Sequence, residues 1–359
     1  MKKTILAALL VFGAAVAQTQ AQTRTQAQAE TRAEAKTEEK AQGHNAIDIM
    51  AEVRADYQHE DVDGSLVPAG SGFKGKYLNL HINGNIGKQF TYSYRQRLNK
   101  ANTSQSFFNA TDWAHLTYSP DSRWMISAGK QVVGIGGYEY DRAPIDVYTA
   151  CEFWNNFACY QFGASVSYIL NGGSDKIMLQ ATQSPYRNEA TEDTYAYNLM
   201  WTGSHGWFNS LYSVNLIEYA PGRFLNYLAL GNHFALGDLD IYLDFMNRAA
   251  GGQKSFFDDC SIILEGVYSL NSQWNVFGKM MYDVNRSDIP ADRSVLPGTE
   301  LLTFGAGVEF FPLKDNRDVR LHANLFYTSG QNGNPAGTLV NGRTLIDAGI
   351  KWKIHILSR

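Results

Sequence analysis

The sequence predicts an all-β protein whose strands close into a transmembrane, antiparallel, up-and-down β-barrel. From His44 onward, apolar and polar residues alternate with the two-residue period of β-strands. The connections between these segments are alternately long and short, as they are in outer-membrane barrels. Aromatic residues gather at the ends of the segments, where such a barrel meets the two membrane interfaces.

The composition supports a β protein and excludes several other classes. The 359 residues are 44% hydrophobic, 13% aromatic and 18% charged, and soluble domains carry about 25% charged residues. Three cysteines are too few for a disulfide framework. A net charge of −4 without a basic patch argues against a nucleic-acid partner. The only long apolar run lies at residues 5–17, so we expect no membrane-spanning helix after it.

Residues 1–17 are predicted to be a cleaved secretory signal peptide. Lys2 and Lys3 precede the apolar run, which ends in the small-x-small pattern Ala15-Val16-Ala17. A membrane anchor is disfavoured because the run is too short to cross about 30 Å of hydrocarbon. Export places the chain in an oxidising compartment.

Residues 18–43 are predicted to be a polar, low-complexity periplasmic linker. Up to Gln42 they consist of Gln, Thr, Ala, Arg, Glu and Lys, which cannot build an apolar core. The barrel is therefore expected to occupy residues 44–359. Its strands are expected at 46–57, 77–86, 90–98, 108–118, 123–131, 160–170, 174–183, 194–203, 207–218, 224–236, 239–246, 260–269, 273–285, 300–311, 318–328 and 343–357.

This count of about sixteen strands is even, within a range of 14–18, and several of the middle segments, notably 108–118 and 224–236, alternate poorly. Connections after odd-numbered strands are expected to be long and those after even-numbered strands short, with 132–159 the longest and 219–223 the shortest of the long set. A soluble β-sandwich would show the same alternation. Segments of about 9–13 residues nevertheless match the ~9–11 residues of a tilted membrane strand better than the ~5–6 of a soluble one.

Local motifs resemble a known family. The chain reads N-A-T-D-W-A-H-L-T-Y from Asn109, W-M-I-S-A-G-K-Q over 124–131, and G-G-Y-E-Y-D from Gly136. Together with the architecture, these segments resemble Gram-negative outer-membrane porins, most of all the porin O/P-like group named for phosphate-selective members. The resemblance implies a cell outer membrane location and a water-filled channel for passive diffusion of small hydrophilic solutes and ions. It is also compatible with a homotrimer.

In the porins that the chain resembles, the third loop folds inward and narrows the pore, and we expect the same of 132–159. An outer loop solvated by its charges is the alternative. The charged residues of this expected constriction loop are Glu139, Asp141, Arg142, Asp146 and Glu152.

Alternation assigns six basic side chains to one side of the lumen and five acidic ones to the other. The basic residues are Arg54, Arg95, Arg97, Arg320, Lys351 and Lys353, and the acidic residues are Asp240, Asp244, Glu265, Asp283 and Glu309. Two interpretations stay open: a transverse field across the channel, or charges paired with neighbours such as Asp48, Glu52 and Asp347. Phosphate-selective members line the pore with many arginines, whereas this set is mixed. An anion- or phosphate-selective channel is therefore the alternative to general diffusion.

Cys151 and Cys159 lie eight residues apart at the end of the third loop and are candidates for a disulfide in an oxidising compartment, with Cys260 left over. Cysteine and histidine spacing suggests no metal site, and we expect no cofactor. The histidines expected on strands are isolated, and no hydrolase or nucleotide motif is present. We expect no catalytic residues; an outer-membrane enzyme or adhesin on a barrel is a lesser alternative. The expected partners are outer-membrane lipid and small solutes.

Overall fold

The computed structural model describes residues 45–102, 108–188, 193–250, 255–287, 291–334 and 342–359. Their strands form one antiparallel sheet, and because β1 pairs with both β3 and β17, the sheet closes into a barrel. One strand, β2, has two residues, and the sixteen others make the wall in the described part of the chain. The predicted sixteen-stranded barrel is confirmed. The signal peptide and linker predicted for 1–17 and 18–43 lie outside the described residues.

Each wall strand pairs with its neighbours along the chain, so the topology is up-and-down. The bounds are β1 Ala46–Val62, β2 Ser65–Leu66, β3 Gly72–Ile86, β4 Phe90–Arg97, β5 Thr111–Tyr118, β6 Trp124–Val132, β7 Tyr160–Leu170, β8 Asp175–Gln183, β9 Tyr195–His205, β10 Phe208–Ala220, β11 Arg223–Leu236, β12 Leu239–Ala250, β13 Asp259–Ser269, β14 Trp274–Asn285, β15 Thr299–Phe310, β16 Val319–Gln331 and β17 Arg343–Ser358.

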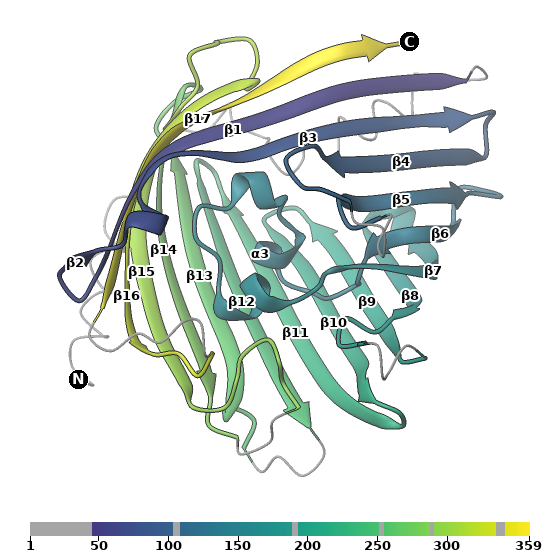
Figure 1. Ribbon diagram of the computed structural model, residues 1–359. Helices are drawn as coiled ribbons and strands as arrows, with labels where there is room; N and C mark the ends of the chain where they lie inside the picture. The colour runs from purple at the N-terminus through teal and green to yellow at the C-terminus, as the bar shows by residue number, and fades with distance from the viewer. Residues whose placement is uncertain (1–44, 103–107, 189–192, 251–254, 288–290, 335–341) are drawn as a thin grey trace.

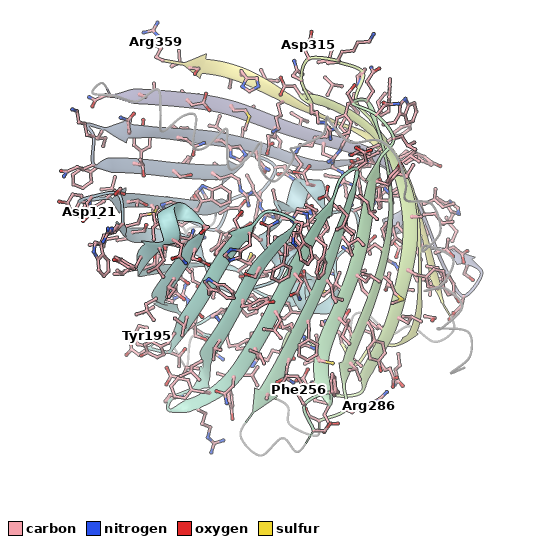
Figure 2. All side chains as sticks on the ribbon, turned by 180° about the vertical axis from the view of Figure 1, so that it is seen from behind. Asp121, Tyr195, Phe256, Arg286, Asp315 and Arg359 are labelled. Carbon is pink, nitrogen blue, oxygen red and sulfur yellow. The ribbon has the colours of Figure 1, made fainter. Side chains whose placement is uncertain are left out.

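Short turns and long loops lie at opposite ends of the barrel. In Figure 2, Asp315 of a short turn and the terminal Arg359 lie at the upper edge, whereas Phe256 and Arg286 of two long loops lie at the lower edge. The predicted alternation of long and short connections fails at the connection predicted as 219–223. There β10 continues to Ala220 and β11 begins at Arg223, which leaves two residues in the turn.

This tight turn has a local cause. Gly222 adopts a φ of 69°, which glycine reaches without steric cost. Its backbone N–H donates to Glu218 Oε1 at 2.6 Å, and Glu218 thereby caps the reversal. The sequence prediction ended both strands too early because it did not recognise this turn.

Cross-strand aromatic pairs mark both ends of the outer surface. Trp274 and Phe310 lie 4.5 Å apart between ring centroids at the short-turn end. At the long-loop end, the rings of Tyr57 and Phe73 lie 5.2 Å apart. Such pairs stabilise adjacent strands and suit the membrane interface.

The third long connection, residues 133–159, contains the helical segments of the lumen. These are α3 (Tyr138–Asp141), the 3-10 turn η2 (Pro144–Asp146) and α4 (Glu152–Asn156). Figure 1 shows α3 and its flanking chain inside the ring of strands. None of the helices in the described part of the chain is long and apolar enough to cross a bilayer.

The third loop buries an apolar cluster against the inner wall, which we call the loop core. Loop 133–159 contributes Tyr140, Phe153 and Phe157, and further residues come from strands and from the connections after β8 and β14. Phe153 is 1% exposed, and its ring centroid lies 4.9 Å from that of Phe157. The strand and other loop members include Tyr186, Ile217, Leu225, Tyr227, Met246, Ile263, Met281, Ala291 and Val295.

Candidate functional site

The third loop is held to β16 and β17 by a shared carboxylate. Asp146 of η2 accepts from Arg320 Nη1 at 2.8 Å and from Lys351 Nζ at 2.7 Å. Burial alone would raise the pKa of Asp146, but Lys351 and Arg320 outweigh that effect and hold the pKa well below its usual range. The carboxylate is therefore ionised, and it joins two wall strands to the loop.

A second group of ion pairs joins the loop to β13 and β14. Lys279 Nζ donates to Glu139 Oε1 at 2.5 Å and to the Thr149 carbonyl at 2.8 Å. Arg142 Nη1 donates to Glu265 Oε1 at 2.7 Å. Glu139 and Lys279 are both almost fully buried. Removing one partner of such a pair leaves an uncompensated charge, which is strongly destabilising.

Backbone groups of the loop also bond to wall carboxylates. The Glu139 N–H donates to Asp244 Oδ2 at 2.7 Å, and the Glu152 N–H donates to Asp283 Oδ2 at 2.9 Å. Two of the acidic lumen residues that alternation predicts therefore serve as anchors for the loop. Asp141 of the loop differs from its neighbour Glu139, because Asp141 is exposed whereas Glu139 is buried.

Arg54 and Tyr148 anchor the middle of the loop. Arg54 Nη1 donates to the carbonyls of Ile145 and Val147 at 3.2 and 3.0 Å. The Tyr148 ring lies under the guanidinium groups of Arg54 and Arg320, at 4.8 and 5.3 Å from its centroid. Its hydroxyl donates to Glu309 Oε1 at 2.7 Å. These contacts combine cation–π attraction with charge-assisted hydrogen bonding.

Glycine permits the closest approach of loop and wall. Gly137 precedes α3 with a φ of 108°. A Cβ on Gly231 of β11 would lie 2.7 Å from the Gly137 Cα, and no side-chain movement could relieve this contact because the atom it meets belongs to the loop backbone. The loop backbone therefore rests directly on β11.

The basic residues of β4 are paired as well. Arg95 Nε and Arg97 Nε donate to Asp112 Oδ2 and Oδ1 at 2.7 and 2.8 Å. The Arg95 guanidinium lies 3.8 Å from the Trp113 ring centroid and also bonds the Tyr160 hydroxyl. Tyr160, the first residue of β7, therefore contacts lumen arginines.

Strict alternation cannot place Asp112 in the lumen. Arg95 pairs with Trp113, whereas Gln96 pairs with Thr111, so Asp112 is the extra residue of a β-bulge. Bulges redirect a side chain relative to its strand. The poor alternation of 108–118 is the only trace of this bulge in the sequence.

The cations of two wall pairs reach the lumen further than their carboxylate partners. The Arg97 side chain is 25% exposed and that of Asp112 6%. The Lys353 side chain is also 25% exposed, while Glu52, whose Oε1 lies 3.9 Å from Lys353 Nζ, is 7% exposed. In both places the positive end faces the water-accessible side.

The strand register places all six predicted basic residues on the inner face. Arg54 lies directly opposite Lys351, and Arg320 lies opposite Lys351 on the other side. The structure pairs most of their charge with carboxylates, as the second of the two interpretations expects. Sequence reasoning did not single out Asp112, Lys279 or Tyr148.

The predicted disulfide is wrong: Cys151, Cys159 and Cys260 are all free thiols. Cys151 precedes α4, where its N–H donates to the Glu139 carboxylate, and α4 separates it from Cys159. The Cys159 carbonyl accepts from the Val133 N–H where the loop rejoins the wall. Burial raises the pKa of the Cys159 thiol to about 11 and that of Cys151 well above its usual range.

One cluster of the described residues has the ligand types of a metal site. Oxygen and nitrogen atoms of Asp56, His322 and Asp347 lie within 4.8 Å of one another. Arg54 Nη2 lies 2.8 Å from Asp56 Oδ2 and 3.6 Å from Asp347 Oδ1, so a guanidinium already neutralises these carboxylates. His322 Nε2 lies 3.1 Å from both carboxylates. The cluster fits a buried ion-pair network better than a metal centre.

Residues 47–212 match the family model described as phosphate-selective porin O and P. No curated protein sequence matches significantly. Among solved structures, an anion-selective porin from Comamonas acidovorans has a TM-score of 0.62 at 10% identity, covering 87% of this chain and 100% of that one.

Two further structures share the fold. The outer-membrane channel DcaP of Acinetobacter baumannii has a TM-score of 0.59 at 12% identity, covering 88% of this chain and 98% of that one. The trimer form of OmpT of Vibrio cholerae has a TM-score of 0.57 at 11% identity, covering 86% and 99%. The fold is that of outer-membrane porins, a class of channels. Residues 47–212 of the chain are similar to the porin O and P family, and the whole barrel shares its fold with porins of the outer membrane.

Proposed function

We propose that the protein forms a water-filled channel for passive diffusion of small hydrophilic solutes and ions, with a modest preference for anions. The observation that carries the anion preference is the greater exposure of Arg97 and Lys353 than of their partners Asp112 and Glu52. A permeating ion meets the positive end of each pair first, which raises the local concentration of anions. The buried carboxylates keep the effect small.

Ion-selectivity measurements in planar bilayers test this proposal. The double substitution Arg97→Gln and Lys353→Gln should move the zero-current potential toward cation preference in a gradient of dilute salt. The shift should shrink in concentrated salt, because the Debye length falls from ~10 Å at 0.1 M to ~3 Å at 1 M. Arg286→Gln is the control, since its pair with Glu300 is exposed on the outer side of the wall.

Two results would contradict the proposal at different levels. A zero-current potential that the double substitution leaves unchanged would reject these residues as determinants of ion preference. A folded, heat-modifiable barrel without any conductance would reject the channel and favour the enzyme or adhesin alternative. The lumen histidines give that alternative little support, since His81 pairs with Glu52 and His233 with Asp240.

The homotrimer belongs to the same proposal. One structural neighbour is described in its trimer form, and a shared barrel fold allows the same assembly here. Light scattering of the detergent-solubilised protein, corrected for bound detergent, should give the mass of three chains. A mass of one chain in mild detergent would contradict the trimer and leave the channel unaffected.

A further inference from the structure

Three aromatic rings gather on the inner wall beside the start of the third loop. His233 of β11 and Tyr242 of β12 lie directly opposite each other, and their rings stack with centroids 4.5 Å apart and planes 10° apart. Tyr138, the first residue of α3, places its ring 5.5 Å from both. We call these three residues the aromatic patch.

The aromatic patch differs from the loop core in its surroundings. Tyr138 and Tyr242 are half-buried, and none of the three residues belongs to the apolar cluster. Tyr138 follows Gly137 at the point where the loop rests on β11. The backbone contact therefore fixes the position of the Tyr138 ring on the lumen side.

Charged and polar side chains surround the rings. Arg142 lies 5.3 Å above the Tyr242 ring and pairs with Glu265, and His233 Nε2 lies 2.7 Å from Asp240 Oδ1. The side chains of Arg142 and Asp240 are 24% and 34% exposed, so a solute in the lumen can reach them. The site thus combines ring surface with donors and acceptors at its edge.

This combination suits a sugar. One face of a pyranose ring presents C–H groups that pack on an aromatic ring, and its edge carries hydroxyls that both donate and accept hydrogen bonds. Binding sites commonly consist of aromatic surface with a few placed polar groups. We propose that the aromatic patch, with Arg142 and Asp240, is a subsite for neutral sugars on the permeation path.

The charged side chains beside the aromatic patch disfavour anions and cations as its ligands. Asp240 and Glu265 repel a small anion near the patch, and the Arg142 guanidinium already occupies the cation–π position over Tyr242. A neutral solute avoids both conflicts. The proposal rests on the proposed function, because a sugar reaches this site only through an open channel.

Sugar-induced interruption of single-channel current tests the subsite. Maltotriose added to the bilayer chamber should interrupt the current in a concentration-dependent manner, and a polyethylene glycol of similar size should do so far less. Tyr138→Ala should weaken the apparent association of maltotriose about tenfold. Tyr138→Phe, which keeps the ring, should retain most of it. Tyr77 lies on β3 opposite Arg54, away from the aromatic patch, and Tyr77→Ala should leave the association of maltotriose unchanged.

The outcomes separate the subsite from the channel. Normal conductance without any maltotriose interruption would overturn the subsite and leave the channel intact. Equal interruption by polyethylene glycol, or an undiminished effect in Tyr138→Ala, would show that size alone causes the block. If Tyr138→Ala fails to fold, Tyr138→Leu, which keeps an apolar side chain without the ring, carries the same expectation.

Discussion

Two parts of the barrel wall have the same strand architecture but differ in what covers their inner faces. We call β10 to β16, which lie against the third loop, the covered wall, and β3 to β7, which border the water path, the open wall. The first carries the third loop and turns Leu225, Tyr227 and Met246 inward against the loop core. The second turns the paired charges of β4 and β5 inward together with small residues of β6 and β7, with Gly129 opposite Gly163 and Ser127 opposite Ser165. Large aliphatic side chains such as Leu225 and Met246 therefore face the lumen where the third loop, rather than water, covers the wall.

The ion pairs of the two walls also differ in where their partners lie. Lys279 on the covered wall has its partner in the loop, whereas Arg97 on the open wall has its partner on the next strand. Ion pairs on the covered wall hold the loop in place, and those on the open wall border the water path. Substitutions on the covered wall should change the pore's size, and those on the open wall its preference for ions.

The largest expected effect comes from the loop core. Phe153→Ala should destabilise the packed loop by about 3–5 kcal/mol, the usual cost of truncating a buried phenylalanine. Loosening of the loop should raise single-channel conductance and expose the loop to proteases. Tyr77→Ala on the open wall is the control, and conductance that rises equally in both variants would contradict the distinction between the walls.

The buried pair of Lys279 and Glu139 ranks next. Lys279→Met leaves Glu139 buried without its partner and should cost about 3–5 kcal/mol, measured by denaturant unfolding in detergent. Adding Glu139→Gln should recover part of this loss, because the uncompensated charge disappears. A double variant as unstable as the sum of the single ones would show that the two side chains do not interact.

A smaller effect is expected from Asp146→Asn. Without the carboxylate, Arg320 and Lys351 gain unpaired positive charge beside the loop, and the zero-current potential should move toward anion preference at low salt. Glu309→Gln is a useful comparison, because Glu309 also approaches Arg320, at 3.4 Å. A shift toward cations after Asp146→Asn would contradict the placement of this pair in the permeation path.

The lowered pKa of Asp146 predicts how acid affects the attachment of the third loop to the wall. Since the pKa of Asp146 is lowered in the folded state, its stabilising contribution is complete above the unfolded value of ~3.9. The contribution is lost as the pH falls further, through the folded value. Conductance noise from loop motion should therefore stay low at neutral and mildly acidic pH and rise only in strong acid. Asp146→Asn should remove that rise.

The smallest effect concerns the cysteines. Mass mapping under non-reducing conditions should find Cys151, Cys159 and Cys260 unlinked. Because burial raises the pKa of the Cys151 and Cys159 thiols, alkylation of the folded protein near neutral pH should be slow and should become fast after unfolding. A linked peptide pair of Cys151 and Cys159 would contradict the structure.

Alternation and turn chemistry along the chain determined the barrel, its strand count and the inward direction of Arg54, Arg95 and Lys351. These features are local, since a strand's two faces follow from its period of two. The β-bulge at Asp112 and the Gly222 turn were missed, because one residue there breaks the period.

Only the tertiary structure decided which charges meet. Lys279 is 140 residues from Glu139, and Arg320 is 174 from Asp146, so no local pattern links them. The tertiary structure also explains why 224–236 alternates poorly: its inner face packs on the third loop and excludes water, so Leu225 and Tyr227 are apolar on the side where a wet lumen would require polar residues.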